Sequence, residues 1–138
     1  MAVIDIAELK LKIAPLAEKY NLKLVVLFGS QATGRTHKNS DIDIGFLPVS
    51  NNDFNSEANL LIDLYQLFRR EDVQLVNLGN ASPLLQYSAL SECVVLFEKD
   101  SGIYNDARNY AFKLYVEAKP LYDLRRFRLS QYVASINI

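Results

Sequence analysis

The chain has 138 residues, enough for one domain with a buried core but too few for a catalytic domain joined to a separate substrate domain. Hydrophobic residues make up 50% of it and charged residues 22%, a globular balance that excludes a disordered chain. The net charge of −1 gives no general attraction for nucleic acid or an anionic membrane, so direct nucleic-acid binding is not expected. We predict a single domain over residues 1–138.

The sequence also lacks the marks of a secreted or membrane protein. Its beginning has no basic region followed by an apolar stretch, and no apolar run reaches the roughly 18 residues that a membrane helix needs. The single cysteine, Cys93, lies in an apolar run and is expected to be a buried thiol. These features predict a cytoplasmic protein with no membrane contact.

The first predicted elements are a helix and a strand. Residues 4–20 have apolar positions at helical spacing, and Pro15 is expected to kink or divide that helix. Residues 23–28 form a short, continuous apolar run that ends at Gly29, as expected for a buried strand.

A sharp turn follows this strand. Gly29 allows backbone angles closed to other residues, and Ser30 is a good helix N-cap, so free N–H groups and a hydroxyl converge there. Such a corner suits a phosphate. Arg35 and Lys38, in the polar loop beyond it, either neutralise phosphate charge or are simply solvated.

Two carboxylates follow at strand spacing. Residues 41–47 begin by alternating polar with apolar, so Asp41 and Asp43 should share one face, roughly 6.6 to 6.8 Å apart at the backbone, with Ile42 and Ile44 in the core. A divalent cation between the two carboxylates relieves their repulsion, and Mg²⁺ takes one or two carboxylates plus phosphate oxygens. The alternative is a pair of solvated acids on an edge strand.

The remaining elements continue an α/β pattern, in which one sheet is covered by helices. Ser56 is expected to cap a helix that ends near Arg70, and residues 72–77 form the third strand. Ser82 and Pro83 open a short helix.

The last third of the chain is expected to hold a strand and two helices. Residues 93–97 form a strongly apolar fourth strand, expected to be central or well covered. A long helix follows until Pro120 ends it, and residues 121–132 form a further helix.

The C-terminal helices are rich in tyrosine and basic residues. Five tyrosines occur there, at positions 104, 110, 115, 122 and 132. Three interpretations stay open: tyrosines packed on the core, a protein interface, or RNA binding.

The spacing of Gly29-Ser30, ten residues, then Asp41-x-Asp43 resembles the signature of the polymerase-beta-like nucleotidyltransferases. The resemblance is to the small Mnt proteins in particular, the antitoxin partners of HEPN ribonuclease toxins. It implies an α/β fold with a mixed sheet of about four strands packed with helices, followed by C-terminal helices.

The resemblance also implies an activity and a set of site residues. Members of the family transfer AMP from ATP with Mg²⁺, and in the HEPN-linked group the acceptor is a tyrosine of the partner toxin. Carried over to this chain, Asp41 and Asp43 are catalytic, while Gly29, Ser30 and Arg35 bind the nucleotide. The metal ligands are Asp41, Asp43 and Asp72.

The chain departs from the family pattern at the third carboxylate. The strand that usually carries it here has Gln74, which has no charge, and Asp72 lies two residues earlier on the same face. Either Asp72 substitutes, or the site works with two carboxylates. The alternative function is a degenerate nucleotidyltransferase fold that neutralises its partner by binding only, and transfer to a small molecule is a third hypothesis.

Overall fold

The computed structural model describes residues 5–29, 32, 41–50 and 54–136. Within them, four strands form one sheet: β1 (Leu22–Phe28), β2 (Ile42–Pro48), β3 (Val73–Asn77) and β4 (Cys93–Glu98). The strand order is β3-β2-β1-β4. β1 runs antiparallel to both of its neighbours, whereas β2 and β3 are parallel. The predicted mixed sheet is therefore confirmed.

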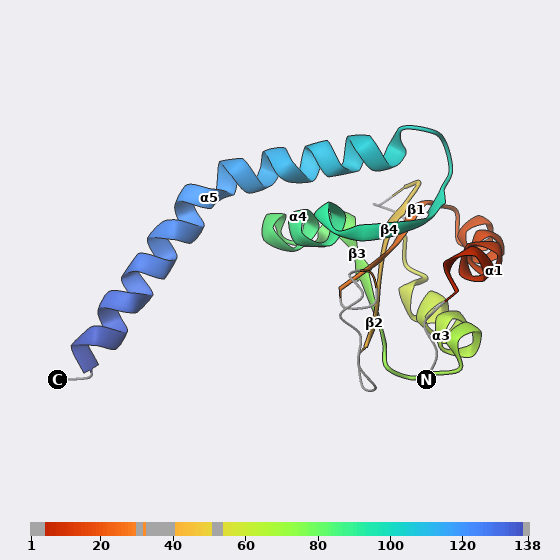
Figure 1. Cartoon of the computed structure of the whole chain (residues 1–138), viewed down its shortest axis with the longest axis horizontal. Coiled ribbons are helices and arrows are strands. Elements are labelled where there is room, and N and C mark those ends of the chain that lie inside the picture. The colour runs from red at the N-terminus through yellow and green to blue at the C-terminus, as the bar shows by residue number, and fades with distance from the viewer. Residues whose placement is uncertain (1–4, 30–31, 33–40, 51–53, 137–138) are drawn as a thin grey trace.

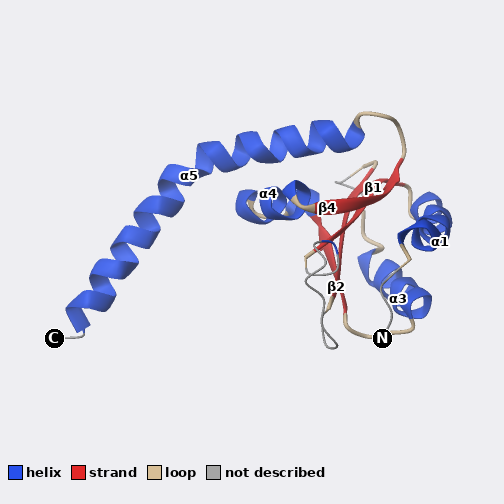
Figure 2. Ribbon diagram, in the orientation of Figure 1, coloured by secondary structure: helices blue, strands red, loops and turns tan. Residues whose placement is uncertain are grey.

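Helices cover both faces of this sheet (Figure 1). The helices are α1 (Ile6–Lys19), α3 (Glu57–Phe68), α4 (Pro83–Ser91) and α5 (Ile103–Ile136), with a short 3₁₀ turn, η1 (Leu78–Asn80), after β3. α1 and α3 lie on one side of the strands, and α4 and the first half of α5 on the other (Figure 2). None of the helices in the described ranges is long and apolar enough to cross a membrane.

β1 is the centre of the core. Val25 and Leu27 are buried on the side of α1 and α3, while Leu24 and Val26 are buried on the side of α4 and α5. A strand covered on both faces needs apolar residues at every position, which is why its sequence runs without alternation.

Two helix starts follow the chemistry of their caps. The Asp5 side chain accepts hydrogen bonds from the N–H groups of Ala7 and Glu8, at 3.1 and 3.4 Å, and opens α1. Ser82 accepts one from the N–H of Leu85 at 3.2 Å and, as predicted, opens α4. Pro15 lies inside α1 without dividing it.

The fourth strand lies elsewhere than expected. β4 is at the edge of the sheet, and among its residues only Leu96 is fully buried. Cys93, at its start, is only partly buried, and that burial raises the pKa of its thiol. The prediction of a central position was wrong, because an apolar run indicates burial but not strand order. The side chains of β4 nevertheless pack against the core on both faces of the sheet.

The prediction of two C-terminal helices was also wrong. α5 continues through Pro120 to Ile136, although the helix changes direction along its length (Figure 1). Proline removes one N–H from the hydrogen-bond ladder, and a kink absorbs the loss here.

The two halves of α5 differ in their surroundings. Three tyrosines of the helix are partly buried, at 104, 115 and 122, whereas Tyr110 and Tyr132 are 58% and 63% exposed. Every residue from Asp123 to Ile136 is exposed. Packing against the rest of the protein therefore accounts for Tyr104, Tyr115 and Tyr122 but not for Tyr110 or Tyr132.

Candidate active site

Gly29 and Asp43 touch at the end of β1. Gly29 has φ +74°, and the residue before it, Phe28, pairs with Asp43 across the sheet. A Cβ atom at residue 29 would collide with a carboxylate oxygen of Asp43 and lie 3.2 Å from its Cγ. Glycine is thus required both for the backbone turn and for the close approach. Ser30 and Arg35, the other predicted nucleotide-binding residues, lie outside the described residues.

Asp41 and Asp43 are close enough to repel each other. Ile42 and Ile44 are each 1% exposed in the core, so Asp43 points to the opposite face of β2, where it is half-buried, while Asp41 is exposed just before the strand. Burial raises the pKa of Asp43, and the negative charge of Asp41 raises it further.

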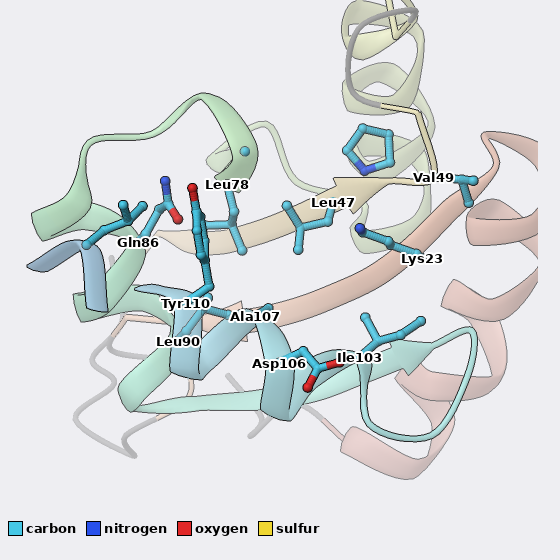
Figure 3. Close-up of a pocket in the computed structure, with 13 residues that line it drawn as sticks. Lys23, Leu47, Val49, Leu78, Gln86, Leu90, Ile103, Asp106, Ala107 and Tyr110 are labelled. Atoms are coloured by element: carbon cyan, nitrogen blue, oxygen red, sulfur yellow. The ribbon is translucent and has the colours of Figure 1, made fainter. Parts of the chain in front are cut away.

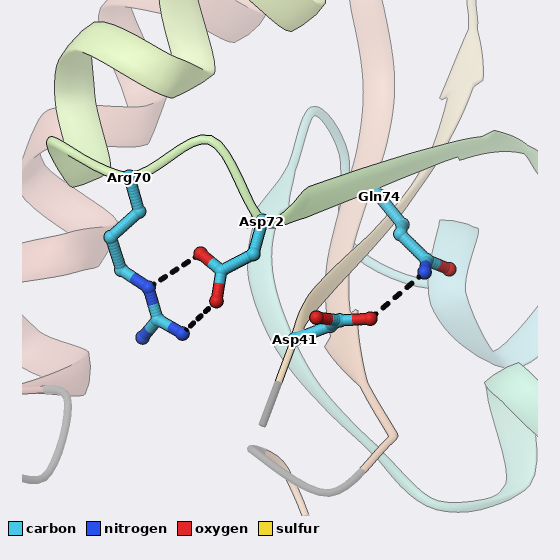
Figure 4. A network of polar contacts seen from close by, with 4 residues as sticks. All are labelled: Asp41, Arg70, Asp72 and Gln74. Atoms are coloured by element: carbon cyan, nitrogen blue, oxygen red, sulfur yellow. Dashed lines mark hydrogen bonds and ion pairs between the residues drawn. The ribbon is translucent and has the colours of Figure 1, made fainter. Parts of the chain in front are cut away.

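Two more polar side chains, Gln74 of β3 and Asp72 just before it, lie near Asp41 (Figure 4). The Nε2 of Gln74 donates a hydrogen bond to Oδ2 of Asp41 at 3.0 Å. Asp72 pairs instead with Arg70, whose Nε donates to Oδ1 at 2.6 Å and whose second guanidinium nitrogen donates to Oδ2. Hydrogen bonding to Arg70 holds the pKa of Asp72 below its ordinary value.

The donor set suits a hard divalent cation that also binds phosphate. Two carboxylates of like charge gather at the Gly29 turn, and within the described ranges no group of three or more His, Cys, Asp or Glu side chains forms a fuller ligand set. Mg²⁺ commonly takes one or two carboxylates and completes its shell with water and substrate oxygens. Asp72 would have to exchange Arg70 for the ion in order to join them.

A cavity of about 460 Å³ opens at Gly29. Its wall includes Tyr87 of α4 and Tyr115 of α5, whose rings stack at 4.6 Å with an angle of 9° between them. The sequence alone does not predict this cavity, because its walls come from segments far apart in the chain. The pairing of tyrosines on two helices is a tertiary feature that helical periodicity does not report.

A second cavity, of about 490 Å³, lies at the other end of β2 (Figure 3). Leu47, Leu78 and Ile103 give it a largely apolar wall, and Lys23 and Asp106 add charge. Of the predicted site residues, those that the structure describes, Gly29, Asp41, Asp43 and Asp72, do not line this cavity.

The chain is similar to a known protein family and to several solved structures. Residues 11–102 match the family model described as polymerase beta, nucleotidyltransferase. A toxin–antitoxin crystal structure with AMP-PNP is 28% identical, with a TM-score of 0.68, over 83% of this chain and 95% of that chain. The MntA–HepT toxin–antitoxin structure is 25% identical, with a TM-score of 0.66, over 92% of this chain and 98% of that chain.

A third structure supports the fold alone. It is the tri-AMPylated Shewanella oneidensis HEPN toxin in complex with MNT antitoxin, 24% identical, with a TM-score of 0.67, over 94% of this chain and 99% of that chain. A comparison with curated proteins found no match. Because the family model spans most of the chain and includes Gly29, Asp41 and Asp43, the chain belongs to the polymerase beta nucleotidyltransferase family.

Proposed function

We propose that this protein is the antitoxin of a HEPN-type toxin and acts as a protein adenylyltransferase that transfers AMP from ATP to a tyrosine of that toxin. The contact between Gly29 and Asp43 carries the proposal, because it joins the phosphate corner to the carboxylate pair. The relatives solved as toxin–antitoxin pairs, one of them with AMP-PNP, support both the partner and the nucleotide. ATP as the substrate implies a cytoplasmic site of action.

The reaction is a single displacement at phosphorus. The acceptor oxygen attacks the α-phosphorus of ATP and forms a new P–O bond, while the bond to the bridging oxygen breaks and pyrophosphate leaves with its electrons. Gly29 and Ser30 hold the phosphates, with Arg35 adding positive charge. Asp41 and Asp43 would hold Mg²⁺, which would supply positive charge to the attacking and leaving oxygens. One of these two aspartates helps to remove the proton of the acceptor hydroxyl.

The predicted third ligand, Asp72, joins this set only if it releases Arg70. A carboxylate that also binds a cation is a weak base, so an acceptor that loses its proton readily is favoured. A phenol, whose pKa is about 10, gives up its proton more readily than an aliphatic alcohol does, and this difference supports tyrosine as the acceptor.

Labelling of the toxin tests the proposal. The protein is incubated with α-labelled ATP, Mg²⁺ and a candidate HEPN-type toxin from the same genome, and mass spectrometry locates AMP on the toxin. We expect labelled tyrosine with the wild type and none with the Asp41→Asn, Asp43→Asn double variant. Absence of label, together with neutralisation of the toxin by the double variant, would instead establish the binding-only function.

A further inference from the structure

The side chain of Gln74 contacts Asp41 directly. Gln74 lies opposite Asp43 in the parallel pairing of β2 with β3, and its side chain reaches Asp41, two residues before Asp43. The bond from Nε2 to Oδ2 of Asp41 is 3.0 Å long, and Figure 4 shows the amide directed at this carboxylate.

The charge of Asp41 fixes the direction of this bond. An ionised carboxylate only accepts hydrogen bonds, so the amide must present its N–H₂ group, and the amide oxygen points elsewhere. Gln74 thus acts toward Asp41 as a donor. It restrains one carboxylate oxygen, Oδ2, and leaves Oδ1 available to another ligand.

Asp72, just before β3, brings no further unpaired carboxylate to Asp41 and Asp43. The two oxygens of Asp72 both accept hydrogen bonds from Arg70, so the acid and the base neutralise each other. The negative charge available for a cation therefore rests on Asp41 and Asp43, and the orientation of Asp41 matters correspondingly more.

A purely structural role does not account for Gln74. Its side chain is exposed, and β3 is an edge strand, so the residue adds nothing to the core. Its neighbours Val73 and Leu75 are the β3 residues that pack toward α1 and α3. Within the part of the chain that the structure describes, the Gln74 side chain hydrogen-bonds to Asp41 alone.

We propose that Gln74 is a positioning residue that orients Asp41 for binding of a divalent cation with the phosphates of ATP, in place of the third carboxylate of the family. The inference rests on the proposed function, since it assumes that Asp41 binds the cation. Loss of a group that orients a metal ligand typically costs 10- to 100-fold in affinity or activity.

Gln74→Met tests this role, because methionine keeps the length of the side chain and removes the donor. Binding of Mn²⁺ in the presence of AMP-PNP is followed by the loss of the electron paramagnetic resonance signal of free Mn²⁺, without any partner protein, and the loss that AMP-PNP causes in the absence of the protein is subtracted. We expect the dissociation constant for Mn²⁺ to rise by about tenfold. Gln66→Met, at an exposed position of α3, is the matched control and should bind as the wild type does.

Two further measurements separate positioning from other effects. The thermal midpoint of Gln74→Met should equal that of the wild type, since an exposed side chain is changed. In an Asp41→Asn background, titrated to higher Mn²⁺, Gln74→Met should cause no additional loss, because Gln74 acts only through the Asp41 carboxylate.

The outcomes distinguish this inference from the proposed function. If the wild type binds no Mn²⁺ with AMP-PNP, the proposed function itself fails. If the wild type binds and Gln74→Met binds equally well, or if the Asp41→Asn background leaves the effect of Gln74→Met intact, only the role of Gln74 is overturned.

Discussion

The carboxylate of Asp43 occupies the space that a side chain at residue 29 would need. The Cγ of Asp43 would lie 3.2 Å from a Cβ atom at that position, and one of its oxygens would clash. The turn after β1 and the start of β2 therefore form one unit. A change on either strand alters the placement of the other.

Gly29→Ala tests this contact. Alanine at φ +74° costs about 1 to 2 kcal/mol in backbone strain and also displaces Asp43, so we expect lower stability and lost binding of AMP-PNP with Mn²⁺. Gly102→Ala is the matched control, because Gly102 has φ +96° but nothing within 4 Å of the added atom. Urea unfolding should show a similar loss of stability in both variants. Calorimetry should show a loss of AMP-PNP binding in Gly29→Ala alone. If Gly29→Ala and Gly102→Ala bound AMP-PNP with Mn²⁺ equally well, the contact between Gly29 and Asp43 would not be needed for nucleotide binding.

Because Asp72 is paired with Arg70, its substitution should slow adenylyl transfer less than substitution of Asp41 or Asp43. We expect adenylyl transfer by Asp72→Asn to fall by less than roughly tenfold, the lower end of what loss of an outer-shell partner costs. Asp41→Asn and Asp43→Asn should each lose more than roughly a hundredfold, the upper end of that range. Initial rates of label transfer measure all three. A loss in Asp72→Asn as large as in the other two would mean that Asp72 releases Arg70 and binds the ion.

An acidic side chain between α1 and α3 predicts a pH dependence of stability. Asp63 of α3 accepts hydrogen bonds from the hydroxyl of Tyr20, at 2.5 Å, and from Nζ of Lys19, at 2.9 Å. Both hold the pKa of Asp63 below its ordinary value, with the bond from Tyr20 as the larger cause. The stabilisation is therefore complete above the unfolded pKa, about 3.9, and is lost as the pH falls through the lower folded pKa.

Tyr20→Phe removes the hydrogen bond that lowers the pKa of Asp63 the most. We expect the free energy of unfolding in urea at neutral pH to fall by about 1 kcal/mol, and the difference from the wild type to shrink as Asp63 becomes protonated. Tyr132→Phe, which changes a 63% exposed ring, should match the wild type throughout. A constant difference between Tyr20→Phe and the wild type down to the most acidic pH would assign the effect to packing instead.

The burial pattern of α5 predicts where the helix stops contributing to stability. Truncation after Asp123, which removes residues 124–138, should change the free energy of unfolding by no more than about 0.5 kcal/mol, since the side chains of residues 124–136 are all exposed. Tyr122→Phe should cost about 0.5 to 1 kcal/mol, because the hydroxyl of Tyr122 accepts the N–H of Leu84 at 3.3 Å, at the start of α4. Chemical denaturation of both variants measures the contrast. If the truncation lowered the free energy of unfolding more than Tyr122→Phe does, residues beyond Asp123 would contribute to stability and the prediction would be wrong.

Local chemistry predicted most of the fold. The apolar run of residues 23–28 identified the central strand, and Ser82 with Pro83 identified the start of α4, because each depends on neighbouring residues alone. The alternation at Asp41 and Asp43 likewise predicted which side chains leave the core. Each of these patterns spans only a few neighbouring residues, so it can be recognised from one sequence.

The features that sequence analysis missed depend on distant parts of the chain. The edge position of β4 follows from strand order, and the continuity of α5 through Pro120 follows from the tolerance of one missing hydrogen bond. The pairing of Arg70 with Asp72, which decides the charge near the site, depends on rotamers that spacing does not fix. The stack of Tyr87 on Tyr115 needs two helices to meet.

The outer half of α5 projects from the molecule as an isolated rod (Figure 1). At 1.5 Å per residue, residues 123–136 extend it by roughly 20 Å. No core packing restricts these positions, so a fluorophore attached near the tip would leave the nucleotide chemistry undisturbed. Its rotation would report directly on any large molecule that this end of the protein engages.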